Sequence, residues 1–252
     1  MLIPILITLL VLLISTILMF KLKLISPAKR AFIICGPVGT GKTVAFQYLT
    51  KGEIPALTVS SLNVSQNELQ LDGEYSKQST FKNIEVFDFP GNGKLKNLYL
   101  RPFLKRELSR VIGVIYMIDS SAFDKDKCHE IAQDLLELLK ITESKPNGVD
   151  ILLYCNKSDL FTSKKKNKVK ELLQEEMVNL IEFNKRGLNK VSGNEDMEEI
   201  DDYGLDAVST GLVDGKFQFQ FLEGNVTFEE GNIWKQDKRS SMIDWIMEKV
   251  VN

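Results

Sequence analysis

The octapeptide Gly36–Thr43 has the residue types and spacing of a phosphate-binding loop. Glycines let such a loop turn its backbone amides inward, where side chains would block the phosphates. The loop follows an apolar run and opens a helical stretch, whose N-terminus adds a partial positive charge. We expect Lys42 to contact the outer phosphates of a nucleotide and the Thr43 hydroxyl to bind Mg²⁺. The phosphate-binding residues predicted here are Gly36, Val38, Gly39, Thr40, Gly41, Lys42 and Thr43.

The tetrapeptide Asn156-Lys157-Ser158-Asp159 indicates which base would be bound. It ends another apolar run, and ligands bind at the carboxyl ends of strands in open α/β sheets. Guanine presents its N1–H and 2-amino donors side by side, and one carboxylate can accept both hydrogen bonds, whereas adenine has no such pair. We assign Asp159 to this contact, the Lys157 stem to the face of the base, and Asn156 to the connection between loops.

A third motif, Asp88-Phe89-Pro90-Gly91, also follows a predicted strand. Asp88 is expected to hold Mg²⁺ through water, and the Gly91 amide to contact the γ-phosphate. That contact exists with GTP and is lost with GDP, so the following segment is a candidate switch. Asn92 stands at the position of the water-orienting glutamine of Ras-like proteins, and its shorter side chain predicts at most slow GTP hydrolysis. The alternative is an ordinary loop residue, and no other catalytic residue is assigned.

Apolar runs alternate along the chain with amphipathic stretches, which is typical of an α/β fold. Strands are predicted at 30–35, 83–87, 111–118, 150–155 and 217–223, and helices at 42–49, 97–110, 127–140, 169–183 and 240–251. This pattern predicts a P-loop small-GTPase fold at 30–252, with a mostly parallel six-stranded sheet and helices on both faces.

Two charged segments each have two interpretations. The acidic stretch within an insertion at about 185–216 is predicted to be a solvated loop, with a docking surface for a basic partner as the alternative. Five lysines at 164–170 are predicted to form a solvated helix start rather than a membrane or RNA patch. The formal net charge of −2 gives no overall attraction to nucleic acid, so direct nucleic-acid binding is not expected.

The N-terminus is the most apolar part of the chain. Residues 2–20 carry no charge and would form a helix of about 28 Å, close to the thickness of a bilayer's hydrocarbon core. We predict a transmembrane anchor at 1–22 and a linker at 23–29, with a cleaved signal peptide as the alternative. Basic residues follow the run, so the positive-inside rule places the large domain in the cytosol. The odd count of three cysteines agrees with a reducing compartment.

With these motifs in place, the chain resembles the fungal type of signal recognition particle receptor β subunits, in the Arf and Sar branch of small GTPases. The resemblance rests on the apolar N-terminus close to the phosphate loop, on 88–91 with the basic 94–96, on 156–161, and on 243–249. It implies a single-pass protein of the endoplasmic reticulum membrane that binds GTP or GDP with Mg²⁺. It further implies GTP-dependent binding of the receptor α subunit in co-translational protein targeting, with the ribosome or translocon as further partners.

The resemblance also suggests residues that motifs alone do not. By position, Thr58 looks like the switch threonine that contacts Mg²⁺, with Ser60 and Ser61 as alternatives. Residues 223–226 stand where the family has its second guanine loop, so the Val226 amide is expected to contact the base oxygen.

Two other functions were weighed. An Arf- or Sar-like cycling GTPase of vesicle traffic would use an interfacial or lipidated N-terminus, whereas the uncharged run favours permanent insertion. A P-loop nucleotide kinase is disfavoured by the guanine motif and by the absence of an arginine-rich lid.

Overall fold

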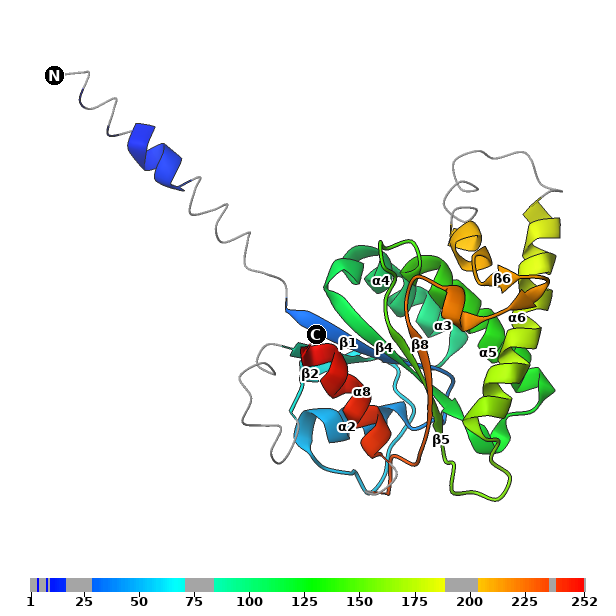
Figure 1. The fold of residues 1–252 in the computed structure, drawn as a ribbon. Helices are drawn as coiled ribbons and strands as arrows, with labels where there is room; N and C mark the ends of the chain where they lie inside the picture. The colour runs from blue at the N-terminus through cyan, green and yellow to red at the C-terminus, as the bar shows by residue number, and fades with distance from the viewer. Residues whose placement is uncertain are drawn as a thin grey trace.

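The structure is a computed structural model that describes residues 4, 8, 10–16, 29–70, 84–188, 204–235 and 239–251. Its centre is a six-stranded sheet in the order β2-β3-β1-β4-β5-β8 (Figure 1). The strands are β1 (Arg30–Cys35), β2 (Ser65–Glu68), β3 (Ile84–Asp88), β4 (Val111–Asp119), β5 (Ile151–Asn156) and β8 (Val226–Glu230). Only the β2–β3 pair is antiparallel in this sheet. The predicted mostly parallel six-stranded sheet is confirmed.

Helices cover both faces of the sheet (Figure 1). They are α2 (Lys42–Lys51), α4 (Arg101–Glu107), α5 (Lys125–Thr142), α6 (Lys166–Leu188) and α8 (Ser240–Val251). Because side chains alternate along a strand, Phe32 and Ile34 of β1 pack with α2 and α8. Ala31, Ile33 and Cys35 belong to the core shared with α4, α5 and α6. The prediction of helices on both faces is therefore confirmed.

The segment after β3 is helical from Gly93 onward, earlier than the predicted start at residue 97. It consists of α3 (Gly93–Leu95), a π-helical turn (Lys96–Leu100), α4, and a 3₁₀ turn (Leu108–Arg110). The Asn92 side-chain oxygen accepts a hydrogen bond of 3.0 Å from the Lys94 amide, which caps the first turn. This cap explains why helix begins immediately after the predicted phosphate contact.

The predicted last strand at 217–223 is wrong. Only Lys216–Phe217 (β7) is extended there, paired with Leu212–Val213 (β6) in a small separate hairpin, and Phe219–Phe221 is a 3₁₀ turn. The sixth strand of the main sheet is β8, which pairs with β5 at the sheet edge. The sequence pattern did not predict β8, because polar residues such as Glu229 and Glu230 keep it from being an apolar run. Figure 1 shows β6 beside α6.

Three predicted segments lie wholly or partly outside the described residues. Of the anchor at 1–22, residues 10–16 are helical and exposed, and none of the helices among the described residues has the length and apolar character needed to cross a bilayer. Of the linker at 23–29, only Lys29 is described. The acidic insertion lacks a described structure at 189–203, whereas residues 204–209 form a helical stretch.

Candidate nucleotide-binding site

Five parallel strands end at one edge of the sheet, where β1, β3, β4, β5 and β8 terminate. In the strand order, β3 lies on one side of β1 and β5 lies on the far side of β4, so the order of the strands reverses between β1 and β4. Ligands bind at such a reversal, at the carboxyl ends of the strands. A cavity of about 520 Å³ opens there. The predicted site residues that line it are Val38, Gly39, Gly41, Lys42, Thr43, Thr58, Gly91, Asn92, Asn156 and Lys157.

The phosphate loop is tightly folded around its own carbonyl groups. The Lys42 ammonium donates a hydrogen bond of 2.6 Å to the Pro37 carbonyl, and the Thr40 hydroxyl donates one of 3.0 Å to the same oxygen. Burial lowers the pKa of Lys42, although Asp88 acts in the opposite direction. Gly41, with φ of 95°, is the N-cap of α2. Gly36 and Thr40 shape the loop without lining the cavity.

Gly91 packs directly against the phosphate loop. A Cβ atom placed there would lie 2.7 Å from both the Lys42 Nζ and the Val38 amide nitrogen, so any larger residue would push the two segments apart. Asn92, the predicted water-orienting residue, lines the cavity while its side-chain oxygen caps the following helix. The structure thus brings Gly91 to the predicted γ-phosphate side of the cavity and gives Asn92 a structural partner.

Two of the three predicted magnesium residues, Thr43 and Asp88, lie together. The Thr43 hydroxyl donates a hydrogen bond of 2.9 Å to Asp88 Oδ2 and lies 3.0 Å from the Ser61 hydroxyl, which is 3.4 Å from the same carboxylate oxygen. Thr58 and Ser60 line the cavity, but among the described contacts only Ser61 of the three candidates joins this cluster.

Asp88 itself carries an unsatisfied atom. Among the described residues its Oδ1 is buried and has no hydrogen-bond partner. Burial raises the pKa of Asp88, and hydrogen bonding from Thr43 and the charge of Lys42 offset part of this effect. A buried, unpaired carboxylate oxygen beside two hydroxyls fits Mg²⁺, which takes oxygen ligands and keeps several of its waters.

The guanine motif connects the loops around the cavity. Asn156 is fully buried, donates to the Thr40 carbonyl at 2.8 Å, and accepts from the Ile233 amide at 3.0 Å. The Lys157 ammonium pairs with the Asp119 carboxylate. Burial acts to raise the pKa of Asp119, but the hydrogen bonds from Lys157 and Ser121 outweigh it, so the pKa is lowered. Asn156 therefore connects two loops at the cavity, and Lys157 lines it. Contact of the Lys157 stem with a base stays a prediction.

Asp159 follows the lining residues Asn156 and Lys157 in the chain but is not itself part of the cavity lining, and both of its carboxylate oxygens have partners. Oδ1 accepts a hydrogen bond of 2.6 Å from the Asn232 amide group, and Oδ2 lies 2.8 Å from the Lys235 ammonium. The hydrogen bond from Lys235 is the main reason that the pKa of Asp159 is lowered, which keeps this carboxyl ionised. An ionised, oriented carboxylate can accept two hydrogen bonds from the edge of guanine.

The assignment of Val226 is wrong. Val226 pairs with Ile151, at the amino end of β5, whereas the cavity lies beyond Asn156, at its carboxyl end. The error follows from the misplaced last strand, since a loop predicted after residue 223 precedes β8 instead of following it. The loop that reaches the site is 231–235, which contributes Asn232, Ile233 and Trp234. Had the half-polar run 226–230 been read as a strand, Gly231 after it would have indicated this loop.

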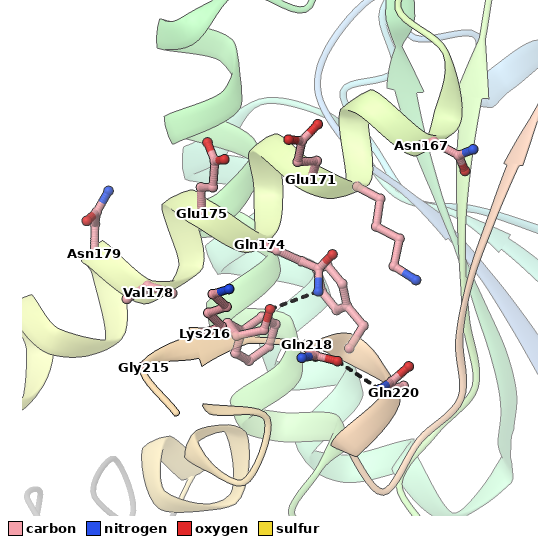
Figure 2. Close-up of a pocket in the computed structure, with 13 residues that line it drawn as sticks. Asn167, Glu171, Gln174, Glu175, Val178, Asn179, Gly215, Lys216, Gln218 and Gln220 are labelled. Carbon is pink, nitrogen blue, oxygen red and sulfur yellow. Dashed lines mark hydrogen bonds between the residues drawn. The ribbon is translucent and has the colours of Figure 1, made fainter. Parts of the chain in front are cut away.

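A larger cavity, of about 790 Å³, lies between α6 and the β7 segment, and it shares no lining residue with the site above. Figure 2 shows that its labelled side chains are mostly polar, with Gln174 bonded to a backbone oxygen, that of Phe217, at 2.8 Å. The neighbouring lysine cluster at 164–170 is largely neutralised, because ion pairs link Lys165 to Glu230 and Lys166 to Glu229. Neither feature resembles a phosphate or nucleic-acid site.

Comparisons with known proteins agree with this geometry. The family model described as signal recognition particle receptor beta subunit matches residues 27–226. The signal recognition particle receptor subunit beta of Saccharomyces cerevisiae is 36% identical over 221 residues, which cover 87% of this chain and 84% of the yeast protein.

Solved structures share the fold. The mammalian SRP receptor matches with a TM-score of 0.64 and 21% identity, over 87% of this chain and 100% of that one. The SRb-GTP/SRX complex and the SRb-GDP-Mg form from Chaetomium thermophilum match with TM-scores of 0.62 and 0.60, both at 20% identity, over 87% and 88% of this chain and 98% of each of theirs. The family match spans most of the chain, and the yeast relative is similar along nearly its whole length. The chain therefore belongs to the family of signal recognition particle receptor β subunits.

Proposed function

We propose that this chain is a GTP-binding β subunit that anchors the signal recognition particle receptor in the endoplasmic reticulum membrane, with its large domain in the cytosol. It binds GTP or GDP with Mg²⁺ in the cavity at the carboxyl edge of the sheet. Gly36–Thr43 surround the phosphates, Asp159 accepts hydrogen bonds from guanine, and Thr43 holds Mg²⁺ with Asp88 acting through water. Ser61 is favoured over Thr58 and Ser60 as the switch ligand, because it contacts both Thr43 and Asp88.

One observation supports this function most strongly. The buried Asn156 side chain connects the phosphate loop to the loop that holds Asp159, through hydrogen bonds of 2.8 and 3.0 Å. Because Asn156 holds the phosphate loop and the loop around Asp159 in one arrangement, the site favours a single ligand that contacts both. A guanine nucleotide has the required length and chemistry.

The output of the site is proposed to be affinity for the receptor α subunit rather than rapid catalysis. The segment that carries the candidate switch ligands Thr58, Ser60 and Ser61 lines the cavity. Its apolar side chains are exposed, at Leu57, Val59 and Leu62. A partner that contacts this segment can distinguish GTP from GDP if the γ-phosphate changes its conformation. Asn92 is engaged as a helix cap, which is consistent with at most slow hydrolysis. The ribosome or translocon would be further partners of the assembled receptor, and a vesicle-coat role is not favoured.

Equilibrium binding of GTP and ATP to the full chain in detergent tests this proposal. We expect tight GTP binding, at least 100-fold weaker ATP binding as is typical when a carboxylate reads a donor pair (~1.5–3 kcal/mol for each charged hydrogen bond), and weakening of GTP binding by EDTA. Lys42→Ala is the matched variant: it removes the proposed phosphate contact together with the hydrogen bond to Pro37, and it should weaken GTP and ATP binding alike because Lys42 is not assigned to the base. Equal affinity for ATP and GTP, or for neither, would refute the proposal.

A further inference from the structure

Trp234 is a large aromatic side chain at the edge of the nucleotide cavity. It lines the cavity together with Lys157. About half of its surface is exposed, 46%, whereas Trp245, the other tryptophan of the chain, belongs to α8, packs against the sheet and is 4% exposed. A half-exposed indole that contributes little to the core leaves one apolar face available for a ligand.

The backbone of Trp234 is fixed in a tight turn. The Trp234 amide donates to Asn232 Oδ1 at 2.9 Å, and the Lys235 amide donates to the Asn232 carbonyl at 3.1 Å. The preceding residue, Ile233, is fully buried and donates its amide to Asn156. These contacts fix the backbone that carries the indole, so only the side-chain rotamer has to be ordered on binding.

The same asparagine places Trp234 relative to the guanine-reading carboxylate. Asn232 donates from Nδ2 to Asp159 Oδ1 at 2.6 Å while its Oδ1 accepts from the Trp234 amide. A purine whose edge meets Asp159 must present its flat faces to the side chains flanking that edge. Two of the side chains that line this cavity, the Lys157 stem and the Trp234 indole, offer extended apolar surfaces for such contact.

We propose that Trp234 is the stacking surface for the purine ring and sets the affinity for the base without choosing between guanine and adenine. This inference rests on the proposed function, because it assumes that the cavity takes a purine nucleotide. Selectivity stays with Asp159, since every purine has a π-face but only guanine has the paired donors.

Binding of GTP, GDP and ATP to the full chain in detergent tests the affinity part. Base stacking on an aromatic side chain is lost on substitution by alanine, so Trp234→Ala should weaken GTP and GDP equally, by roughly 5- to 150-fold, and leave the GTP-to-ATP ratio unchanged. Trp234→Phe should recover part of the loss because it keeps a smaller aromatic face. A Trp234→Ala protein that binds GTP within about twofold of wild type, or that changes the GTP-to-ATP ratio, would overturn the proposal.

Energy transfer from tryptophan to N-methylanthraniloyl-GTP tests the proximity part. We expect strong transfer in wild type and in Trp245→Phe, and loss of transfer in Trp234→Phe. Because Trp245 is the tryptophan of the core, strong transfer in Trp245→Phe also shows that the signal does not depend on the core. Transfer that persists in Trp234→Phe and disappears in Trp245→Phe would contradict the assignment. Failure of wild type itself to bind the probe would instead refute the proposed function, so the two failures are distinguishable.

Discussion

The buried Asp88 carboxylate is expected to lower the stability of the fold at neutral pH and to serve the proposed Mg²⁺ site. Burial raises its pKa above the ordinary value of 3.8, so the folded chain disfavours the ionised carboxylate that Mg²⁺ requires. A raised folded-state pKa means that the associated stability is fully present below the unfolded-state pKa and is lost as pH rises through the folded-state pKa. At neutral pH, Asp88 is therefore an unfavourable charge that the metal is proposed to offset.

The substitution Asp88→Asn should separate these two effects. Without nucleotide and Mg²⁺, we expect a higher Tm than wild type at neutral pH, and the difference should shrink as pH falls toward 3.8. The same variant should lose the Mg²⁺-dependent part of GTP affinity. Calorimetry and binding titrations measure both, and Asp126→Asn, at an exposed acid, is the control. A lower Tm for Asp88→Asn under these conditions would show that the charge is stabilising instead.

Asp159 is predicted to determine base choice. The substitution Asp159→Asn replaces one acceptor of the carboxylate by a donor, so guanine's paired donors lose a partner while xanthine, with a carbonyl in place of the 2-amino group, gains one. We expect GTP affinity to fall by about 10- to 150-fold, from about 1.5–3 kcal/mol for the charged hydrogen bond lost, and xanthosine triphosphate to become the better ligand. Competition binding measures the exchange. Unchanged GTP affinity would remove Asp159 from the site.

At the scale of elements, motifs predicted the site better than periodicity predicted the fold. The phosphate loop and residues 156–159 were predictable because each motif follows a mostly apolar, buried strand, and such strands are easy to recognise. The edge strands β2 and β8 were missed because their polar residues face solvent or form ion pairs. Local pattern does not reveal an edge strand, since its position comes from pairing with a distant neighbour. The missed strand β8 led to the wrong assignment of Val226 to the guanine loop, and for the same reason Trp234 was not predicted as a site residue.

The candidate switch helix is joined to α5 by an ion pair whose lysine is buried and whose aspartate is partly exposed. Lys96, in the π-helical turn, pairs with Asp134, which also accepts a hydrogen bond of 3.1 Å from the Tyr116 hydroxyl. The Lys96 side chain is only 9% exposed, so removing its partner would leave a charge with little access to water. This contact holds the segment that follows Gly91 against α5 at its π-helical turn.

We therefore expect Asp134→Ala to lower the free energy of unfolding by about 3 kcal/mol or more, because breaking a buried pair costs far more than breaking an exposed one. The control is Glu130→Ala, which removes the exposed Lys127 pair on the same helix and should cost less than about 1 kcal/mol. Urea unfolding compares the two. Similar losses for both variants would mean that the Lys96 pair is solvated.

At the scale of the whole molecule, the nucleotide cavity and the point where the N-terminal segment joins β1 lie at opposite edges of the sheet. β1 begins at Arg30, and the phosphate loop follows its last residue, Cys35, roughly 20 Å away along an extended strand. If residues 1–22 span the bilayer, the short linker at 23–29 brings the amino edge of the sheet toward the membrane. The nucleotide cavity and its exposed switch then face the cytosol, where a partner subunit can reach them.

The anchor itself is open to a direct test. Wild type should stay in the membrane fraction after alkaline extraction, since an uncharged apolar helix of this length has a large transfer free energy into lipid. Deletion of residues 1–24 should release a soluble protein that still binds GTP, because the cavity is built from residues beyond Arg30. The double variant Leu10→Lys/Leu13→Lys keeps the full length but places two charges in the run, at about 2.5–3.5 kcal/mol each, and should also be extracted. A truncated protein that still sediments with membranes would place the anchor elsewhere in the chain, whereas one that is soluble but no longer binds GTP would mean that the first 24 residues support the nucleotide site.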